Sequence, residues 1–102
     1  MAKGSDDILA ASTKFRYKGE EVSVSIFVPC KEFADSGEYS CRFSIKGGEI
    51  EYSGRSIGFD SMQSLMLTMT KIGNYLEYND EFDCAQMEWE GGVMIFPTFS
   101  NS

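Results

Sequence analysis

The sequence contains no histidine. Histidine is the commonest general base near neutral pH and the commonest side-chain ligand of protein metal sites. Its absence removes the most frequent catalytic and metal-binding arrangements, so we expect no cofactor and no metal. The glycine-rich phosphate loop, the G-x-S-x-G nucleophile turn and the H-E-x-x-H zinc motif are also missing. Residues 79–83 (NDEFD) offer oxygen ligands, but they lack the glycine and the final glutamate of a calcium loop.

Cysteine is scarce, with three residues in the chain. Cys30, Cys41 and Cys84 are odd in number and have no C-x-x-C spacing, which argues against a disulfide framework and against a zinc site. Cys41 alternates with aromatic residues, so we expect its side chain in the core. Cys30 or Cys84 would need a base other than histidine to act as a nucleophile. A small cysteine-dependent enzyme is therefore a remote alternative, and we do not expect an enzyme.

Long apolar runs are absent as well. No run approaches the roughly 20 residues that a membrane-spanning helix needs. The first residues, MAKGSDDILAAS, lack the apolar centre of a secretory signal. We therefore expect a cytoplasmic protein in which residues 1–10 form a flexible leader, residues 11–99 a single domain and residues 100–102 a tail.

Basic residues are missing from the last part of the chain. All nine Lys and Arg residues lie at or before Lys71, whereas residues 72–102 contain six acidic residues and no basic one. The formal net charge is −7. Nucleic acid and anionic membranes repel such a chain, so neither is expected as a partner. A cationic protein is the favoured partner, and ordinary solubility is the competing explanation of the acidity.

The first half of the chain shows the period-two alternation of half-buried strands. Apolar and polar residues alternate in residues 14–18, 22–28, 39–46 and 50–52. Short glycine-containing segments separate the first strand from the second and the third from the fourth, which is typical of hairpin turns. The pattern predicts four antiparallel strands with one face on a core and the other in water.

The period changes after Gly58. One stripe of an α-helix is predicted there, with Asp60 as its N-cap, Gln63 as its capping-box partner and an end near residue 78. Two further strands follow, around the hairpin pair at 91–92. The predicted fold is α+β, a two-layer sandwich in which one long amphipathic helix covers an antiparallel sheet of about six strands, in the order ββββαββ. The helical stripe consists of Met62, Leu65, Met66, Met69, Ile72 and Leu76.

The helix run GFDSMQSLMLTMTKIGNYL and the later GGVMIFPTF resemble a family of small uncharacterised bacterial proteins. That family shares a G-x-D-S-x-Q-A-L-x-L-A-L-x-x-I-G-x-x-L helix and a late G-[IVL]-x-F-P strand. Ser64 and Thr68 depart from the pattern, where alanine is usual, and the last motif is slightly longer here. The resemblance implies a bacterial, soluble α+β domain of unknown function, and it carries over no site residue.

Residues 74–90 (NYLEYNDEFDCAQMEWE) combine six carboxylates with four large aromatic side chains. Two of the aromatics, Tyr75 and Tyr78, lie off the helical stripe and should be partly exposed, whereas Trp89 is expected in the core. Carboxylates speed association with a basic partner, and tyrosines supply packed contacts. A solvated helix end and loop is the competing explanation. The candidate partner-binding residues are Tyr75, Glu77, Tyr78, Asp80, Glu81, Asp83, Glu88 and Glu90.

These features favour an acidic protein-binding module. The most specific hypothesis is an immunity protein that neutralises a cationic bacterial toxin, for example a nuclease, by covering its basic site. The alternative is a chaperone or adaptor for a secreted protein, which would bind extended segments through apolar patches. Such chaperones usually form dimers, and the sequence itself does not set the oligomeric state of this chain.

Overall fold

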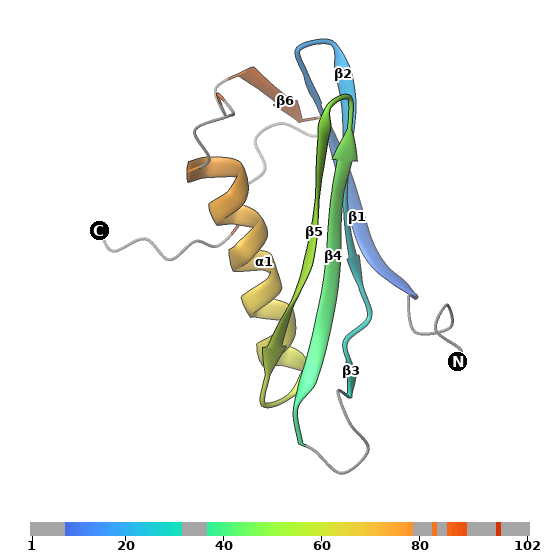
Figure 1. Cartoon of the computed structure of the whole chain (residues 1–102), viewed down its shortest axis with the longest axis vertical. Coiled ribbons are helices and arrows are strands. Elements are labelled where there is room, and N and C mark those ends of the chain that lie inside the picture. Colours follow the sequence, from blue (N-terminus) through green and yellow to red (C-terminus); the bar gives the residue numbers. More distant parts are fainter. Residues whose placement is uncertain (1–7, 32–36, 79–82, 84–85, 90–95, 97–102) are drawn as a thin grey trace.

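The computed structural model describes residues 8–31, 37–78, 83, 86–89 and 96. They form an antiparallel sheet of six strands with one α-helix across one face (Figure 1). This arrangement confirms the predicted α+β fold, with the helix after the first set of strands. The elements are β1 (Leu9–Tyr17), β2 (Glu20–Phe27), β3 (Cys30–Lys31), β4 (Tyr39–Gly47), β5 (Ile50–Gly58), α1 (Ser61–Tyr78) and β6 (Met87–Trp89).

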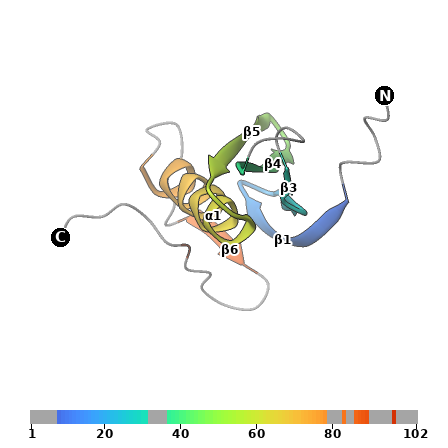
Figure 2. The same cartoon turned by 90° about the horizontal axis from the view of Figure 1, so that it is seen from below.

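The sheet follows the chain as a meander. β1 pairs with β2, β2 with β4, and β4 with β5, each antiparallel. The two-residue β3 also pairs with β4, and β6 pairs with β1. Figure 2 shows α1 on one side of the sheet, with no described helix or strand on the other side. The predicted strand at residues 93–97 falls outside the described residues, apart from Phe96, which packs against the core.

Glycine and positive backbone angles set the two tight turns. Lys18 and Gly19 have φ values of 53° and 84°, as a type I′ hairpin requires. A turn at the glycine pair Gly47-Gly48 was expected in the other hairpin. Gly47 instead pairs with Ile50, so the turn begins one residue later, at Gly48. Gly47 instead belongs to β4, where a Cβ would collide with the main chain of Glu21. The absence of a side chain at Gly47 therefore lets β4 approach β2 at this point.

The core lies between the sheet and α1. Every second residue of β2, of β4 and of the second half of β1 points into it, as the alternation predicts, whereas residues 9–12 of β1 are exposed. Cys41 is fully buried, which confirms its expected place in the core. The buried apolar residues are Phe15, Tyr17, Val22, Val24, Ile26, Cys41, Phe43, Ile45, Ile72 and Leu76.

The face that α1 turns to the sheet differs from the predicted stripe. Ile72 and Leu76 are buried as predicted, but Met62 is 65% exposed and Met66 is 56% exposed. The prediction was therefore wrong for these two methionines. Leu65 and Met69 are partly buried at the margin of the core. The residues of α1 that are buried are Ser64, Thr68, Thr70, Ile72, Gly73 and Leu76.

Small side chains explain this rotation of the helix. Ser64 and Thr68 are fully buried, and the Thr68 hydroxyl donates a hydrogen bond of 2.9 Å to the carbonyl oxygen of Cys41. A hydroxyl that is satisfied in this way can be buried without a large penalty. At Gly58 a Cβ would lie 2.6 Å from the main-chain nitrogen of Ser64. Small residues thus let α1 approach the sheet closely, and the longer methionines are left at the outer side.

The beginning of α1 is capped by side chains. Asp60 Oδ1 accepts a hydrogen bond of 2.8 Å from the main-chain nitrogen of Gln63, which confirms Asp60 as the N-cap. Gln63 Oε1 in turn accepts from the main-chain nitrogen of Phe59 at 2.6 Å, one residue before the predicted capping-box position.

No helix in the described part of the chain is long and apolar enough to cross a membrane.

Candidate functional site

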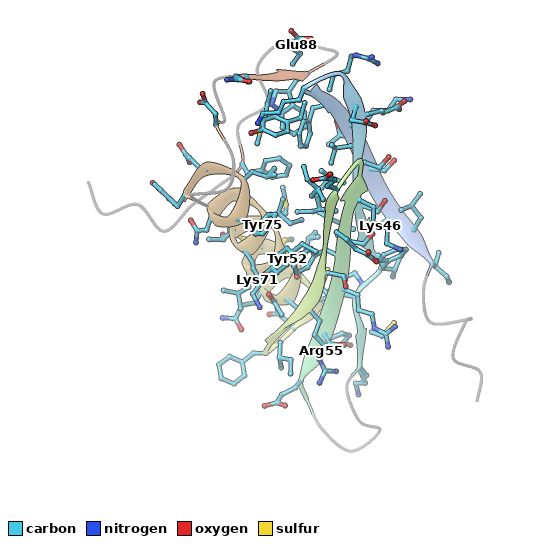
Figure 3. The ribbon with its side chains drawn as sticks, turned by 45° about the horizontal axis from the view of Figure 1, so that its top comes forward. Lys46, Tyr52, Arg55, Lys71, Tyr75 and Glu88 are labelled. Atoms are coloured by element: carbon cyan, nitrogen blue, oxygen red, sulfur yellow. The ribbon has the colours of Figure 1, made fainter. Side chains whose placement is uncertain are left out.

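A groove of about 650 Å³ runs between β5 and α1. We call it the tyrosine groove because Tyr52, Tyr75 and Tyr78 contribute to its walls. Figure 3 shows Tyr52 on the sheet facing Tyr75 and Lys71 on the helix. The described residues that line the groove are Tyr52, Arg55, Ser56, Ile57, Leu67, Lys71, Asn74, Tyr75 and Tyr78.

Aromatic stacking fixes the walls of the groove at one point. The rings of Tyr52 and Tyr75 stack with centroids 4.0 Å apart and planes 9° from parallel. Tyr52 also packs against the buried ring of Phe43, with centroids 5.5 Å apart, so the stack is anchored in the core. Tyr75 is half-buried and Tyr78 is 59% exposed, which confirms the expected partial exposure of both tyrosines.

The charge of the groove is opposite to that of the chain. Lys71 belongs to the lining, and none of the described lining residues is acidic. Arg55 lies opposite Arg42 in the pairing of β5 with β4, so its side chain is on the outer face of the sheet and its main chain borders the groove. The Lys71 ammonium donates a hydrogen bond of 3.1 Å to the main-chain carbonyl of Arg55, linking α1 to β5. The groove therefore presents one positive group, the Lys71 ammonium, beside aromatic and aliphatic side chains.

The predicted carboxylates do not gather in this groove. Glu77 is exposed on α1 but is not part of the lining. Asp83 is exposed beyond the helix, where its main-chain nitrogen donates to the Tyr17 hydroxyl at 3.0 Å. Glu88 lies on β6, apart from Tyr75 (Figure 3). The remaining candidates, Asp80, Glu81 and Glu90, fall outside the described residues.

Glu88 has basic neighbours on the outer face of the sheet. It lies opposite Arg16 in the pairing of β6 with β1. Lys14 and Glu21 line the same shallow depression and form an ion pair of 2.9 Å. The hydrogen bond and positive charge of Lys14 lower the pKa of Glu21 below its ordinary value. Acidic and basic groups are therefore interspersed around Glu88.

Trp89 is half-buried against the core, as predicted. Its ring centroid lies 4.5 Å from that of Phe15 and 6.1 Å from that of Phe96. The side chain of Trp89 therefore serves packing between β6 and the rest of the sheet.

The described residues offer little for catalysis. They contain no group of three or more Cys, Asp or Glu side chains that could hold a metal ion. The Cys41 thiol donates to the carbonyl of Phe27 at 3.4 Å, and burial raises its pKa above the ordinary value of a cysteine. A thiol that stays protonated is a poor nucleophile. Cys30 is half-buried, and Cys84 lies outside the described residues.

Comparison with known proteins gives a family but no activity. A family model described as a domain of unknown function, DUF6968, matches residues 11–97. The chain belongs to this family. No curated protein and no solved structure matches it. The observed groove and charges are therefore the basis for any functional statement about this DUF6968 domain.

Two features of this DUF6968 domain were missed in the sequence. The first is the meeting of Tyr52, the Arg55 carbonyl and Lys71 in one groove, which depends on the distance between α1 and the edge of β5. The second is the exposed apolar surface of Met62 and Met66, which depends on the rotation of α1. The small residues Ser64 and Thr68 were the available signal, because small side chains in a helix permit close approach to a sheet.

Proposed function

We propose that this DUF6968 domain is an acidic protein-binding module, and more specifically an immunity protein that neutralises a cationic bacterial toxin. A toxin such as a nuclease would be blocked when the acidic surface, which we define by the carboxylates of residues 77–90, covers its basic site. One observation carries the proposal: residues 72–102 hold six acidic residues and no basic one. Those of the six that are described, Glu77, Asp83 and Glu88, are all exposed.

The end of α1 supports a negative docking surface. The last turn of the helix contains no basic residue, so the partial negative charge of its C-terminus is not neutralised there. Glu77 is exposed in that turn, and Tyr78 beside it is 59% exposed. An exposed aromatic ring among carboxylates can pack into a basic surface while the charges raise the association rate.

A charge-swap series tests this surface. One variant carries lysine in place of Glu77, Asp80, Glu81 and Asp83. Calorimetry then measures its binding to the basic partner protein. We expect affinity to fall by roughly tenfold or more, since about 1.4 kcal/mol corresponds to a factor of ten. The matched control replaces Glu49 and Glu51, exposed acids of the β4–β5 hairpin, and should leave affinity nearly unchanged. Unchanged affinity in the first variant would mean that the partner binds another surface.

A second candidate function has its own support. Phe59, which precedes α1, is 78% exposed, and Met62 and Met66 in the first two turns of the helix are 65% and 56% exposed. Flexible methionines on a surface can adapt to varied apolar segments, as a chaperone or adaptor for a secreted protein requires. A salt-tolerant dimer that binds an unfolded segment would support this function. A salt-sensitive complex of one chain with one folded basic domain would support immunity.

The remote third candidate is a cysteine-dependent enzyme that uses Cys30 or Cys84. Its test is a thiol-reactivity assay on the folded chain at neutral pH. Labelling of either cysteine well above the rate of a free thiol would support this candidate, because an activated cysteine has a lowered pKa. Rates at or below that of a free thiol would remove it.

A further inference from the structure

β5 lies at an edge of the sheet. Among the described strands it pairs with β4 and with no other, over nine residues from Ile50 to Gly58. The main-chain groups on the far side of such a strand can pair with an added strand. In this domain that side of β5 adjoins the tyrosine groove.

The direction of the edge groups follows from one hydrogen bond. The carbonyl of Arg55 accepts from the Lys71 ammonium on α1, so it points away from β4 and towards the groove. In an antiparallel pair, alternate residues direct both their N–H and C=O groups to the same side. The main-chain groups of Ser53 and Ile57 therefore share the direction of Arg55. The groove contains a row of strand-pairing groups along one wall.

The other wall can hold side chains. α1 contributes Leu67, Lys71, Asn74 and Tyr75, which combine aliphatic, aromatic and polar surface. The distance along β5 from Tyr52 to Ile57 corresponds to about 17 Å of extended chain. An extended segment placed there would form main-chain hydrogen bonds with β5 and side-chain contacts with α1. This is the geometry of recognition by strand addition.

Charge selects the kind of segment. Lys71 carries a positive charge in the groove, and the described lining residues include no carboxylate. At physiological ionic strength charges more than about 8 Å apart are largely screened. The nearby Lys71 ammonium therefore acts more strongly on a ligand inside the groove than carboxylates farther away do.

We propose that the tyrosine groove binds an extended acidic segment of a partner protein, which adds to the sheet as a strand beside β5. Lys71 then leaves the Arg55 carbonyl, which accepts a main-chain N–H of the segment instead. The Lys71 ammonium pairs with a carboxylate of the segment. This inference goes beyond the proposed function and does not rest on it, because it uses the positive groove and not the acidic surface.

The probe is a capped hexapeptide of alternating valine and glutamate, titrated to millimolar concentration against the full ¹⁵N-labelled chain. We expect saturable shifts of the amide signals of Ser53, Arg55 and Ile57, together with Lys71. A peptide with lysine in place of glutamate should cause no such shifts. A glutamate peptide N-methylated at every amide should also fail, because it has no N–H group to donate to β5.

Matched charge reversals complete the test. Lys71→Glu should weaken binding of the glutamate peptide by roughly tenfold, the effect of about 1.4 kcal/mol. Lys46→Glu, on the exposed face of β4, should leave binding within about twofold of the original. The dispersion of the amide spectrum verifies folding of each variant.

Three results of the peptide titrations would overturn the inference. The first is that no amide signal shifts at millimolar peptide. The second is that the lysine peptide or the methylated peptide binds as tightly as the glutamate peptide. The third is that the shifts are confined to residues outside β5 and α1. Concentration-dependent shifts at the edge of β5 without peptide would also overturn it, because they would identify a second copy of the chain as the occupant. None of these results bears on the acidic surface, so this test fails or succeeds independently of the proposed function.

Discussion

The hydroxyl of Thr68 donates a hydrogen bond of 2.9 Å to the main-chain carbonyl of Cys41, inside the core. Both residues are fully buried, and the bond joins α1 to the middle of the sheet. It orients the helix so that small residues face β4 and β5 while Met62 and Met66 face outward. The position of the tyrosine groove beside β5 depends on this orientation.

Replacing Thr68 by valine should destabilise the fold by about 0.5–1.5 kcal/mol, because the shape is kept while a buried hydrogen bond between α1 and β4 is lost. Urea unfolding measures the change. Thr70→Val is the control: the Thr70 hydroxyl bonds to Met66 O, which also accepts the main-chain bond of the helix. We expect a change below about 0.5 kcal/mol there. Equal effects of the two substitutions would contradict the role given to Thr68.

The rotation of α1 predicts unequal effects at two residues of the helical stripe. Ile72→Ala should cost about 2–5 kcal/mol, because Ile72 is fully buried between helix and sheet. Met62→Ala should change stability by less than about 0.5 kcal/mol, because Met62 is 65% exposed. Thermal or urea unfolding compares the two variants. If Met62→Ala lowered the free energy of unfolding as much as Ile72→Ala does, the buried stripe predicted from the sequence would be correct.

The sequence was informative about elements and less so about their orientation. Period-two alternation placed Phe15, Val24 and Phe43 in the core, and Asp60 was recognised as the N-cap, because these patterns are local. The face of α1 was mistaken because hydrophobicity favoured Met62 over Thr68. A buried hydroxyl with a partner 27 residues away in the chain is a tertiary feature, which no local pattern contains.

Close packing of α1 on the end of β5 makes Gly58 sensitive to substitution. An added Cβ would lie 2.6 Å from Ser64 N and 3.0 Å from the carbonyl carbon of Gln63, both main-chain atoms. Gly58→Ala should therefore destabilise the domain by roughly 1–3 kcal/mol in urea unfolding. Gly37→Ala, where no atom lies within 4 Å, should be close to neutral. A neutral Gly58→Ala would show that the helix can move away from the sheet at no cost.

Burial of Cys41 predicts a dependence of stability on alkaline pH. Burial raises its pKa in the folded state, so the fold favours the neutral thiol. The stabilising contribution is present below the unfolded pKa of about 8.5 and is lost as pH rises through the folded pKa. Urea unfolding across this range should show a decline for the original chain that is reduced in Cys41→Ala. Identical pH profiles of the two chains would contradict burial of the thiol.

The candidate site could be predicted only in part. Tyr75 and Tyr78 were correctly expected at an accessible surface, because helical periodicity relates them to Ile72 and Leu76. Their neighbours Tyr52 and Arg55 come from β5, and the approach of that strand to α1 is a property of the whole fold. Glu88 is separated from the helix because β6 pairs with β1 at the opposite edge of the sheet.

The proposed function requires the acidic surface to bind a basic protein through charge. The most direct measurement is capture from a lysate of the encoding organism at about 50 and 300 mM salt, which straddle weak and strong screening. The bait is either the original chain or the variant with lysine at Glu77, Asp80, Glu81 and Asp83. We predict that the original chain retains one basic protein at low salt, loses it at high salt and inhibits its activity, while the variant captures none. Equal capture at both salt concentrations, or by both baits, would contradict the claim.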